Sequence, residues 1–596
     1  MKKIFLFSFP LTLLLACSCE SDPLALWGAG SDDDPSEASS GSSSSSAAST
    51  YTVSYVQDDE GDNVSLVSFD RTITITYSSA GATVSGDEHG IVRVSGNDVT
   101  ADNTGHDEKV NYVLKGTASD GFFKVYGANK QAITLDGLNL TNRNGAAINN
   151  QSKKRTFVVL RGANRLADGA SYTDTPDTED EKAAFFSEGQ LVFSGEGSLS
   201  VTATGKAGIT SADYVRFLGT QQVTVNSSAG HGVRGKDAVV VTDGTLSVTA
   251  SAAGKKAISS DGEVIIDGGK TTLTVSGGVD SSDSSDLDGS AGIKADGNFT
   301  MGGGTLTITN SGQGGKGISA DVRGYFNGGS VRVEVSGTNY GSSGNNGGPG
   351  RPGGWWGAAS SSSSDNSVAA KAIKCDGDIV FAGSDVTAIA KNHEAIESKG
   401  KIDIEGGRVY AKSSDDAINA ASHLTISDGF VCAVSTGNDG LDSNGNMYIM
   451  GGVVYSVSAG GAEVALDANT EGGYKLYLSG GTLFAIGGLE RGAQLTQTCY
   501  SASWNKNTWY AMRVGDKTYA FQTPSSGGSG LVVSGASTPE LLSGVSVSGG
   551  ESLFDGMGLL DPAVSGGATV SLSAYSAGNG GFGPRGGRFN GQRIPL

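Results

Sequence analysis

The chain is dominated by a repeat of about 23 residues, which is clearest between residues 395 and 472. Each copy in this stretch has a small residue, then Ile or Leu, then Glu, Asp or Asn. The copies start at Ala395, Ala417, Gly440 and Ala465. A repeat of this length is one coil of a stacked structure, because a single coil cannot bury its apolar face alone. Stacking places equivalent residues above one another, so residues far apart in the sequence form columns.

Earlier copies carry the same signals, and they start at Ala147, Ala184, Gly208, Gly232, Ala257, Gly292, Gly317 and Ala372. Each copy also has a strand signal after a Gly, as in residues 244–249, with apolar residues at alternate positions. A shorter strand signal lies between the two, as in residues 401–404. The 93 Gly and only 11 Pro fit many short strands and turns. Three short strands per coil predict an all-β chain folded as a right-handed parallel β-helix. Leucine-rich repeats have a similar length, but their Leu and Asn signature is absent.

We expect the β-helix to span residues 131–488. Three intervals between copies are longer than the rest, and each contains a polar insertion. The insertions are expected at residues 165–182, 279–290 and 337–368. The last of them is rich in Gly and Ser and carries Trp355 and Trp356 near its centre.

The period is lost on both sides of this span. Alternating strand patterns predict an N-terminal β cap over residues 51–130 and a C-terminal β cap over residues 489–576. Caps are expected because the end coils of a solenoid would otherwise expose core and strand edges. The Gly/Arg-rich tail, residues 577–596, is predicted to be disordered.

The first residues predict export. Residues 1–17 have two lysines followed by an apolar run, and they end in Leu-Leu-Ala-Cys, which resembles a lipoprotein cleavage box. We expect Cys17 to be lipidated, with an ordinary secretory signal as the alternative. Residues 18–50, rich in Ser and Asp, predict a flexible tether. The protein is therefore expected in the cell envelope, in the outer membrane and with surface exposure as one option, touching the membrane only through its lipid.

The net charge of −20 argues against a nucleic-acid partner, because no excess of Lys and Arg is present to meet phosphates. An acidic surface instead suits divalent cations. Nothing in the sequence indicates an oligomer, so a monomer is expected. The five Cys show no spacing typical of a disulfide framework or a zinc site.

Two columns of the repeat turn acidic in the same coils. The third residues of successive copies are Thr210, Arg234, Ser259, Lys294, Ser319, Lys374, Glu397, Asn419, Asp442 and Asp467. The residues just before the later copies are Lys316, Lys371, Glu394, Asp416 and Asp439. Carboxylates stacked about 4.8 Å apart repel one another unless a cation lies between them. Calcium suits such a set because it takes six to eight oxygen ligands.

We therefore predict a calcium site whose ligands come from Glu394, Glu397, Asp415, Asp416, Asn419, Asp439 and Asp442. The alternative is a solvated acidic edge in which Asp and Asn serve only the turns.

The strands that follow a Gly supply a further column on their outward side. It reads Ser200, Thr224, Ser247, Thr274, Thr307, Arg332, Thr387, Tyr410, Cys432, Tyr455 and Phe484. An exposed ring can stack on the apolar face of a sugar, so Tyr410, Tyr455 and Phe484 are predicted to bind carbohydrate. The alternative is that these rings pack under a cap. Trp355 and Trp356 are separate candidates for sugar contact.

The run from residue 391 to 452 resembles the bacterial carbohydrate-binding β-helix family known from clostridial cellulose- and pectin-binding surface proteins. Its repeated pattern is small-Ile-acid, then Gly-Gly, then Ser-Ser-Asp-Asp-Gly-Ile-Asn, which matches residues 413–419 except that Ala417 replaces Gly. Ala395 is a second such replacement. The resemblance covers roughly residues 90–490. It implies a pectate-lyase-like fold, bound calcium, and binding of plant-type polysaccharide without established catalysis.

Three functions remain open on this basis. The leading one is a non-catalytic, calcium-loaded lipoprotein of the cell surface that binds a cellulose- or pectin-like polysaccharide. The second is a calcium-dependent polysaccharide lyase, in which Lys374, Lys399 or Lys412 would abstract the proton beside a uronate carboxylate. The third is a structural, adhesin-type surface protein.

Overall fold

The structure is a computed structural model that describes residues 59–173, 176, 178–341 and 367–578. The predicted signal with Cys17, the tether, Trp355 with Trp356, and the tail from residue 579 lie outside the described residues. The described residues belong to one compact unit, residues 48–596. No helix among them is long and apolar enough to cross a membrane.

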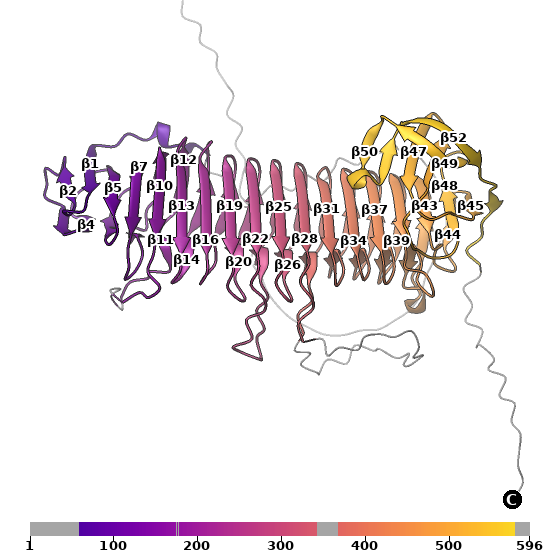
Figure 1. The fold of residues 1–596 in the computed structure, drawn as a ribbon, viewed down its shortest axis with the longest axis horizontal. Helices are drawn as coiled ribbons and strands as arrows, with labels where there is room; N and C mark the ends of the chain where they lie inside the picture. The colour runs from indigo at the N-terminus through magenta and orange to yellow at the C-terminus, as the bar shows by residue number, and fades with distance from the viewer. Residues whose placement is uncertain (1–58, 174–175, 177, 342–366, 579–596) are drawn as a thin grey trace, which may run out of the picture. The chain divides into compact units, whose positions relative to one another are not determined.

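The described chain is a parallel β-helix, as predicted, with three strand faces (Figure 1). Face 1 is a sheet of fifteen strands formed by the small-Ile-acid segments. Its strands are β3 (Val92–Ser95), β4 (Asp98–Asn103), β6 (Phe122–Gly127), β8 (Ile148–Asn150), β11 (Ala183–Ser187), β14 (Ala207–Ser211), β17 (Val233–Gly235), β20 (Lys256–Ser260), β23 (Ala291–Ala295), β26 (Lys316–Ala320), β29 (Lys371–Cys375), β32 (Ile396–Ser398), β35 (Ile418–Ala420), β38 (Leu441–Ser443) and β41 (Leu466–Ala468).

Face 2 contains the short middle strands, and face 3 contains the strands that follow a Gly. Face 2 consists of β9 (Thr156–Arg161), β12 (Leu191–Gly195), β15 (Tyr214–Phe217), β18 (Ala238–Val241), β21 (Glu263–Ile266), β24 (Phe299–Met301), β27 (Gly324–Phe326), β30 (Ile379–Phe381), β33 (Ile402–Ile404), β36 (Leu424–Ile426), β39 (Met447–Ile449), β42 (Leu476–Leu478) and β44 (Gln494–Leu495). Face 3 consists of β10 (Ala163–Ala167), β13 (Ser198–Ala203), β16 (Gln222–Ser227), β19 (Thr245–Ala250), β22 (Lys270–Val275), β25 (Thr305–Asn310), β28 (Ser330–Val335), β31 (Asp385–Ala390), β34 (Arg408–Ser413), β37 (Phe430–Ser435), β40 (Val453–Val457) and β43 (Thr482–Ile486).

The solenoid begins earlier than residue 131. Strand β1 (Arg71–Tyr77) pairs in parallel with β5 (Val110–Ala118), and β5 pairs in parallel with β7 (Gln131–Thr141). Strand β7 then pairs with both β9 and β10, which joins faces 2 and 3. Most of the predicted N-terminal cap is therefore itself coiled. Only the hairpins of β1 with β2 (Thr83–Ser85) and of β3 with β4 are antiparallel there.

A short N-terminal strap lies against face 2. It comprises α1 (Asp59–Asp62) and η1 (Val64–Leu66), and its apolar residues pack on outward residues such as Phe157 and Val240. Asp62 at the end of α1 is 1% exposed and forms ion pairs with Arg155 and Arg216, each at 3.0 Å. Because the carboxylate and the Arg216 guanidinium are removed from water and that of Arg155 is largely so, this contact ties the strap to two coils of the solenoid.

The described chain ends in a C-terminal cap of antiparallel strands. Six antiparallel strands form it, namely β46 (Trp509–Val514), β47 (Lys517–Gln522), β49 (Glu540–Ser548), β50 (Glu551–Leu553), β51 (Gly558–Leu560) and β52 (Ala563–Thr569). The connecting strands β45 (Cys499–Ala502), β48 (Leu531–Ser534) and β53 (Ser573–Ala574) extend the solenoid sheet by antiparallel pairing. The short helix η2 (Thr470–Gly472) lies between β41 and β42 of the solenoid, and η3 (Phe554–Gly556) lies between β50 and β51 of the cap.

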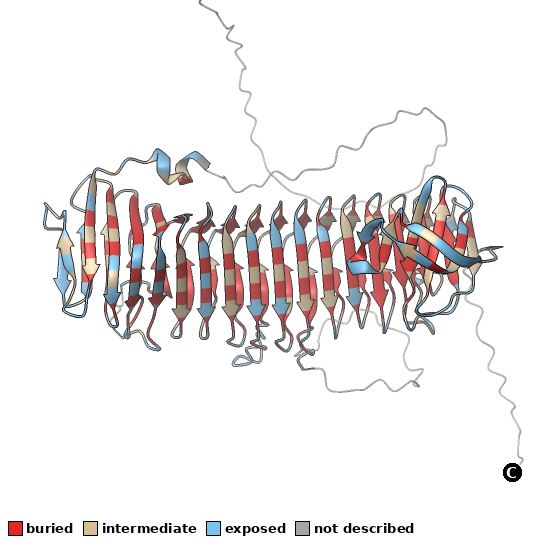
Figure 2. Ribbon diagram, turned by 45° about the horizontal axis from the view of Figure 1, so that its top comes forward, coloured by how far each residue is buried: buried red, intermediate tan, exposed pale blue. Residues whose placement is uncertain are grey.

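The register confirms the columns of face 1. Thr210, Arg234 and Ser259 are aligned in successive strands, and the column continues through Lys374, Glu397, Asn419, Asp442 and Asp467 as expected. On face 3 one member was misplaced, because Thr272 and not Thr274 pairs between Ser247 and Thr307. Alternate residues of each strand point inward and are buried, which gives the banded pattern of Figure 2.

The core is a stack of aliphatic and aromatic columns. The inward residue of face 1 is buried in every coil from Ile148 through Ile396 and Ile418 to Leu466. On face 2 the rings of Phe299, Phe326 and Phe381 succeed one another with centroids 5.5 and 4.7 Å apart. Each coil buries its apolar residues only against its neighbours, so stability accumulates along the axis.

The Gly before most face 3 strands is required by backbone geometry. Gly304, Gly407 and Gly452 have φ of 71°, 74° and 70°, a conformation that L side chains rarely adopt. A Cβ on Gly407 would also lie 2.5 Å from the carbonyl oxygen of Ser384 in the preceding coil. The repeated Gly signal of the sequence therefore marks a left-handed turn between faces 2 and 3.

The small residue that starts each copy is matched to a core residue on face 3. A Cβ on Gly208 would lie 2.3 Å from Cγ1 of Val225, so the glycine makes room for the valine. In the coil that starts at Ala395, this alanine replaces the glycine. The residue at the register position of Val225 in that coil is Ala411, which lacks the two Cγ methyl groups of valine. The replacement is accommodated because volume moves from one position to the other.

Candidate functional site

The three aromatic residues predicted to meet sugars are buried, so the prediction for Tyr410, Tyr455 and Phe484 is wrong. Their exposed fractions are 5%, 0% and 0%. The Tyr455 ring packs on Phe484 and on Phe521 of the C-terminal cap, and its hydroxyl donates to the carbonyl of Gln522 at 2.8 Å. The outward column of face 3 becomes aromatic in these coils because the cap covers it.

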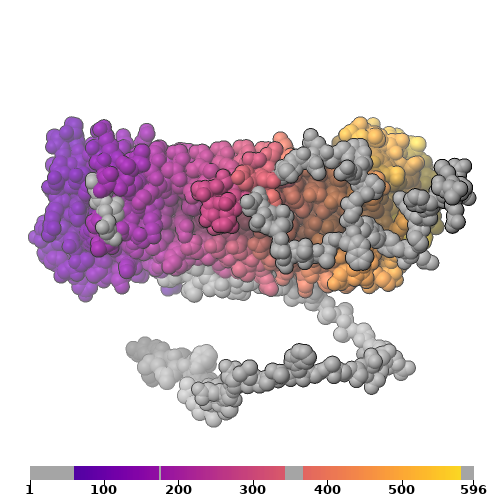
Figure 3. All heavy atoms as spheres, turned by 90° about the horizontal axis from the view of Figure 1, so that it is seen from below, coloured from indigo at the N-terminus to yellow at the C-terminus, as the bar shows by residue number. Residues whose placement is uncertain are grey.

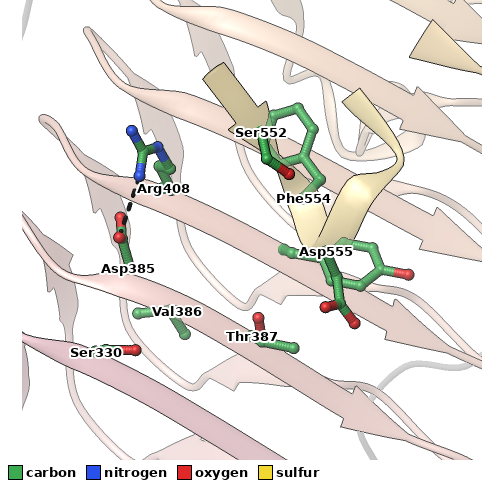
Figure 4. A pocket seen from close by; sticks show the side chains of 9 residues that line it. Ser330, Asp385, Val386, Thr387, Arg408, Ser552, Phe554 and Asp555 are labelled. Carbon is green, nitrogen blue, oxygen red and sulfur yellow. Dashed lines mark hydrogen bonds and ion pairs between the residues drawn. The ribbon is translucent and has the colours of Figure 1, made fainter. Parts of the chain in front are cut away.

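A small polar cleft marks the edge of this joint (Figure 4). It has a volume of about 160 Å³ and lies between face 3 and the cap. Ion pairs fill its rim: Arg408 lies 3.2 Å from Asp385, and it also pairs with Glu551 of the cap. Across the cleft, Arg332 lies 3.4 Å from Asp555. These contacts join the cap to the solenoid, and the cleft is too small for a saccharide chain.

Other aromatic side chains gather on face 2, in a column that the sequence interpretation passed over. Tyr448 and Tyr477 are aligned in register and stack with centroids 5.2 Å apart at 10°. His423 and Tyr474 lie edge-on beside them. The faces of the two stacked rings are turned toward each other, so the column presents mainly ring edges to solvent.

The acidic residues of face 1 form a ladder along its last coils. Asn419 donates through Nδ2 to Oδ2 of Asp416 at 3.1 Å and to Oδ2 of Asp442 at 2.9 Å, so the two carboxylates converge on one amide. The other oxygen of Asp416 accepts the N–H of Asp439 at 3.1 Å. Oδ1 of Asp439 accepts the N–H of Val464 at 2.5 Å. Each of these two aspartates therefore caps the following coil.

The ladder continues beyond the predicted residues. Asp467 follows Asp442 in register, and Leu466 bridges Leu489, which places Glu490 beside Asp467. Glu490 also accepts the hydroxyl of Thr470 at 3.0 Å. Asp467 was visible as the last member of its column. Glu490 follows at the same spacing, as the third residue of Gly488-Leu489-Glu490, but it lies just beyond the span in which the repeat was recognised. We call Asp416, Asn419, Asp439, Asp442, Asp467 and Glu490 the acidic ladder.

The acidic ladder lacks compensating positive charge. None of its carboxylates forms an ion pair with a Lys, Arg or His among the described residues. Burial, reinforced by the neighbouring carboxylates, raises the pKa of Asp416 to about 6, of Asp439 to about 7 and of Asp442 to about 8. Burial and the hydrogen bond with Glu490 raise the pKa of Asp467 to about 10. Protons are thus retained where no cation neutralises the charge.

Glu394 and Glu397 have a different environment. Lys371 pairs with Glu397 and lies 3.3 Å from Glu394, and Lys399 pairs with Glu397 from the other side. Burial alone would raise the pKa of Glu397, but the two lysines outweigh it and the pKa is lowered. This carboxylate already has its counter-charge.

Asp415 stands apart from the acidic ladder. It joins His393 and Glu394 in a group whose potential ligand atoms lie within 4.8 Å of one another. His393 contacts Glu394 and lies 3.4 Å from Asp415, while Asn438 donates to Asp415 at 3.0 Å. A ring nitrogen with two carboxylates is a mixed donor set, whereas calcium prefers oxygen throughout.

The lysines considered for a lyase reaction do not converge. Lys374 lies 2.6 Å from Asp376, Lys399 pairs with Glu397, and Lys412 is exposed on face 3. Among the described residues, no lysine is poised beside the acidic ladder.

A family model described as "carbohydrate-binding domain-containing protein" matches residues 95–417. The match spans more than half of the chain, and the protein belongs to this family. It covers the solenoid up to Ala417, so most of the acidic ladder follows it. No curated protein matches the chain.

One solved structure, described as the polysaccharide lyase-like protein from C. thermocellum in a gadolinium derivative, is similar to part of the chain. It is 21% identical, covers 45% of this chain and 92% of its own, and has a TM-score of 0.31.

Proposed function

We propose that this protein is a non-catalytic polysaccharide-binding protein of the cell envelope whose acidic ladder holds calcium. Membership of a carbohydrate-binding family supports polysaccharide as the ligand. The resemblance of residues 391–452 to cellulose- and pectin-binding surface proteins supports a ligand of the plant type. The observation that carries the calcium is the uncompensated, half-buried column of carboxylates at the end of face 1. The lipobox before Cys17 supports export and lipid anchoring.

The donor set fits a hard divalent cation. Asp416, Asp439, Asp442 and Asp467 supply carboxylate oxygens on adjacent coils, which lie about 4.8 Å apart. Asn419 adds an amide, and a half-turn of that amide would present Oδ1 in place of Nδ2, since the two atoms are nearly isosteric. Bound calcium would supply positive charge to the carboxylates and could accept further oxygen ligands.

Glu397 is left out of this set because its charge is already met by Lys371 and Lys399. Glu394 shares Lys371 and His393, so it borders the set without belonging to it. Asp415 is retained only as an outer neighbour, through Asn438 and the adjacent Asp416. The proposed calcium ligands therefore lie one coil further toward the C-terminus than the sequence interpretation placed their centre.

Calcium titration by calorimetry tests the cation. The full chain should bind calcium with measurable heat and a rise in melting temperature, because ligand binding to the native state stabilises it by about 2.7 kcal/mol at a hundredfold excess over Kd. Asp416→Asn with Asp439→Asn should lose most of that rise. Asp403→Asn, an exposed-side aspartate of face 2 outside the ladder, is the matched control. Absence of calcium-dependent heat in the parent chain would show that the acidic ladder does not bind calcium.

Catalysis is tested separately. Incubation with polygalacturonate in calcium should give no rise in ultraviolet absorbance from unsaturated product. Turnover that depended on Lys374, Lys399 or Lys412 would replace binding with lyase activity.

A further inference from the structure

The N-terminal half of face 1 carries a groove whose charge is opposite to that of the acidic ladder. Its volume is about 830 Å³, and it runs over β11, β14, β17 and β20. Six cationic side chains line it: Lys153, Lys182, Lys206, Arg234, Lys236 and Lys255. Only three acids do so, Asp180, Glu188 and Asp261. In a chain of net charge −20, this local excess of positive charge is unusual.

Several of these cationic side chains form no ion pair with a described residue. Arg234 pairs with Asp261 at 2.6 Å and Lys182 with Asp180 at 2.6 Å. Lys153, Lys236 and Lys255 form no ion pair with any described residue. Burial, and to a smaller extent the charges of Lys256, Lys255 and Arg234, lowers the pKa of His231 to about 3, so this histidine adds no charge at neutral pH.

The groove is walled by parts of the chain that interrupt the repeat. Phe186, an outward residue of β11, is fully buried in a cluster with Ala183 and Ala207. Tyr172 of the insertion after β10 lies under Lys206, with the ammonium 4.4 Å from the ring. The insertion at residues 279–290 stands on the same side of the solenoid further along (Figure 3). Gly205 and Gly230 also line the groove, where the chain packs closely: a Cβ on Gly205 would lie 2.2 Å from the carbonyl oxygen of Gly169, and one on Gly230 would lie 2.5 Å from the backbone nitrogen of Ala207.

One polar group in the floor lacks a partner. Thr210 lies in the outward column between Phe186 and Arg234 and is 4% exposed. Its Oγ1 is buried and makes no hydrogen bond within the described chain. A buried hydroxyl without a partner is unfavourable by about 1–3 kcal/mol, so such a group is expected where a ligand completes it.

We propose that this lysine-lined groove is a binding site for an acidic saccharide chain, one whose sugars carry carboxylate or sulfate groups. The proposal rests on the proposed function, from which it takes the saccharide nature of the ligand. The lysines meet the anionic groups, and the Thr210 hydroxyl bonds to a sugar oxygen. The contact does not require calcium, since the cations are side chains of the protein itself.

The test measures binding by the full chain in EDTA, which removes any contribution of the acidic ladder. The probes are polygalacturonate, dextran sulfate, hydroxyethylcellulose as a neutral chain, and a poly-dT oligonucleotide as an anion without saccharide specificity. The groove variant is Lys153→Gln with Lys236→Gln and Lys255→Gln. The control is Lys270→Gln with Lys401→Gln and Lys412→Gln, which changes the charge equally at exposed lysines elsewhere.

The groove variant should bind at least one acidic polysaccharide roughly tenfold more weakly than the parent and the control do. The polygalacturonate and dextran sulfate arms show whether carboxylate or sulfate is preferred. Thr210→Val should also weaken that binding while melting no lower than the parent, because the deleted hydroxyl has no partner to lose.

Equal affinity of the groove and control variants for the acidic chains would overturn the inference. Binding of poly-dT as tight as that of the acidic polysaccharides, or binding of the neutral chain alone, would overturn it too. The proposed function survives each of these results as long as the parent chain binds a polysaccharide in calcium, and fails if it binds none.

Discussion

The backbone N–H of Asp439 donates to Oδ1 of Asp416 in the preceding coil, at 3.1 Å. The contact recurs one coil later, where the N–H of Val464 donates to Asp439. The aspartates of this column thus accept backbone N–H groups of the following coil, a structural role that does not need their negative charge. Their negative charge is not neutralised by a cationic side chain of the described residues, and it adds to that of the Asp442 and Asp467 carboxylates on the same face.

The stability of the calcium-free chain should fall as pH rises from about 4 to about 8. The pKa values of Asp416, Asp439 and Asp442 are raised to about 6, 7 and 8, so the folded chain binds more protons than the unfolded chain across this window. Their stabilising contribution is complete below the unfolded pKa and is lost as pH passes the folded pKa. Melting temperatures at pH 5, 7 and 9 in EDTA measure the slope.

Calcium should flatten this slope, because a bound cation replaces the protons. Asp442→Asn should flatten it in EDTA as well, whereas Asp403→Asn should not. A melting temperature in EDTA that is constant or rises between pH 5 and 8 would show that the ladder is already neutralised by the protein.

Substitutions of Asp439 should separate its two roles. Asp439→Asn keeps an oxygen that accepts the N–H of Val464, so in EDTA at pH 8 it should be as stable as the parent or more so. Asp439→Ala leaves that amide without a partner and should cost about 1–3 kcal/mol. Chemical denaturation of both variants measures the difference, and equal stabilities would show that the hydrogen bond contributes nothing.

The pairing of small residues between faces 1 and 3 predicts a non-additive double mutant. Ala411→Val should destabilise the chain by about 1–3 kcal/mol through overpacking against Ala395. Ala395→Gly alone should cost about 0.5–1 kcal/mol. The double variant reproduces the Gly208 and Val225 arrangement and should be more stable than the sum of the two changes predicts. Strict additivity would mean that the two positions do not share space.

Tyr455 should act on the cap and not on glycan binding. Tyr455→Ala removes a fully buried ring that contacts Phe484 and Phe521, and should cost about 3–5 kcal/mol. Tyr455→Phe loses only the hydrogen bond to Gln522 and should cost about 1 kcal/mol. At temperatures where both variants are folded, polysaccharide affinity should equal that of the parent. A selective loss of affinity in the folded Tyr455→Phe variant would contradict this assignment.

The repeat allowed the columns to be read correctly because every coil of a solenoid has nearly the same length. The alignment of Glu397, Asn419 and Asp442 followed from spacing alone. The first coils escaped detection since β1 and β5 are separated by an irregular hairpin, which hides the period. Thr274 was misplaced by two residues because Thr271, a polar residue, occupies the inward position that Leu246 fills in the neighbouring strand, so Leu273 was taken for the first inward residue of β22.

What covers a face could not be read from the repeat. Tyr410 and Tyr455 occupy outward positions, and only the folded cap, more than fifty residues later, makes those positions interior. The sequence contained one sign that Glu397 is neutralised, because Lys371 precedes Glu394 in the neighbouring column. That Lys371 pairs with Glu397 depends on side-chain geometry, which the repeat does not give. The lysine-lined groove was not detected from the sequence because the strongly negative net charge says nothing of how charges are distributed over the surface.

The central claim is most directly tested by a glycan array probed with the full chain in calcium and again in EDTA. Saturable retention of one or more polysaccharides is expected in calcium, and weaker but measurable retention of acidic chains is expected in EDTA through the lysine-lined groove. Retention of no polysaccharide in calcium, by protein shown to be folded, would contradict it.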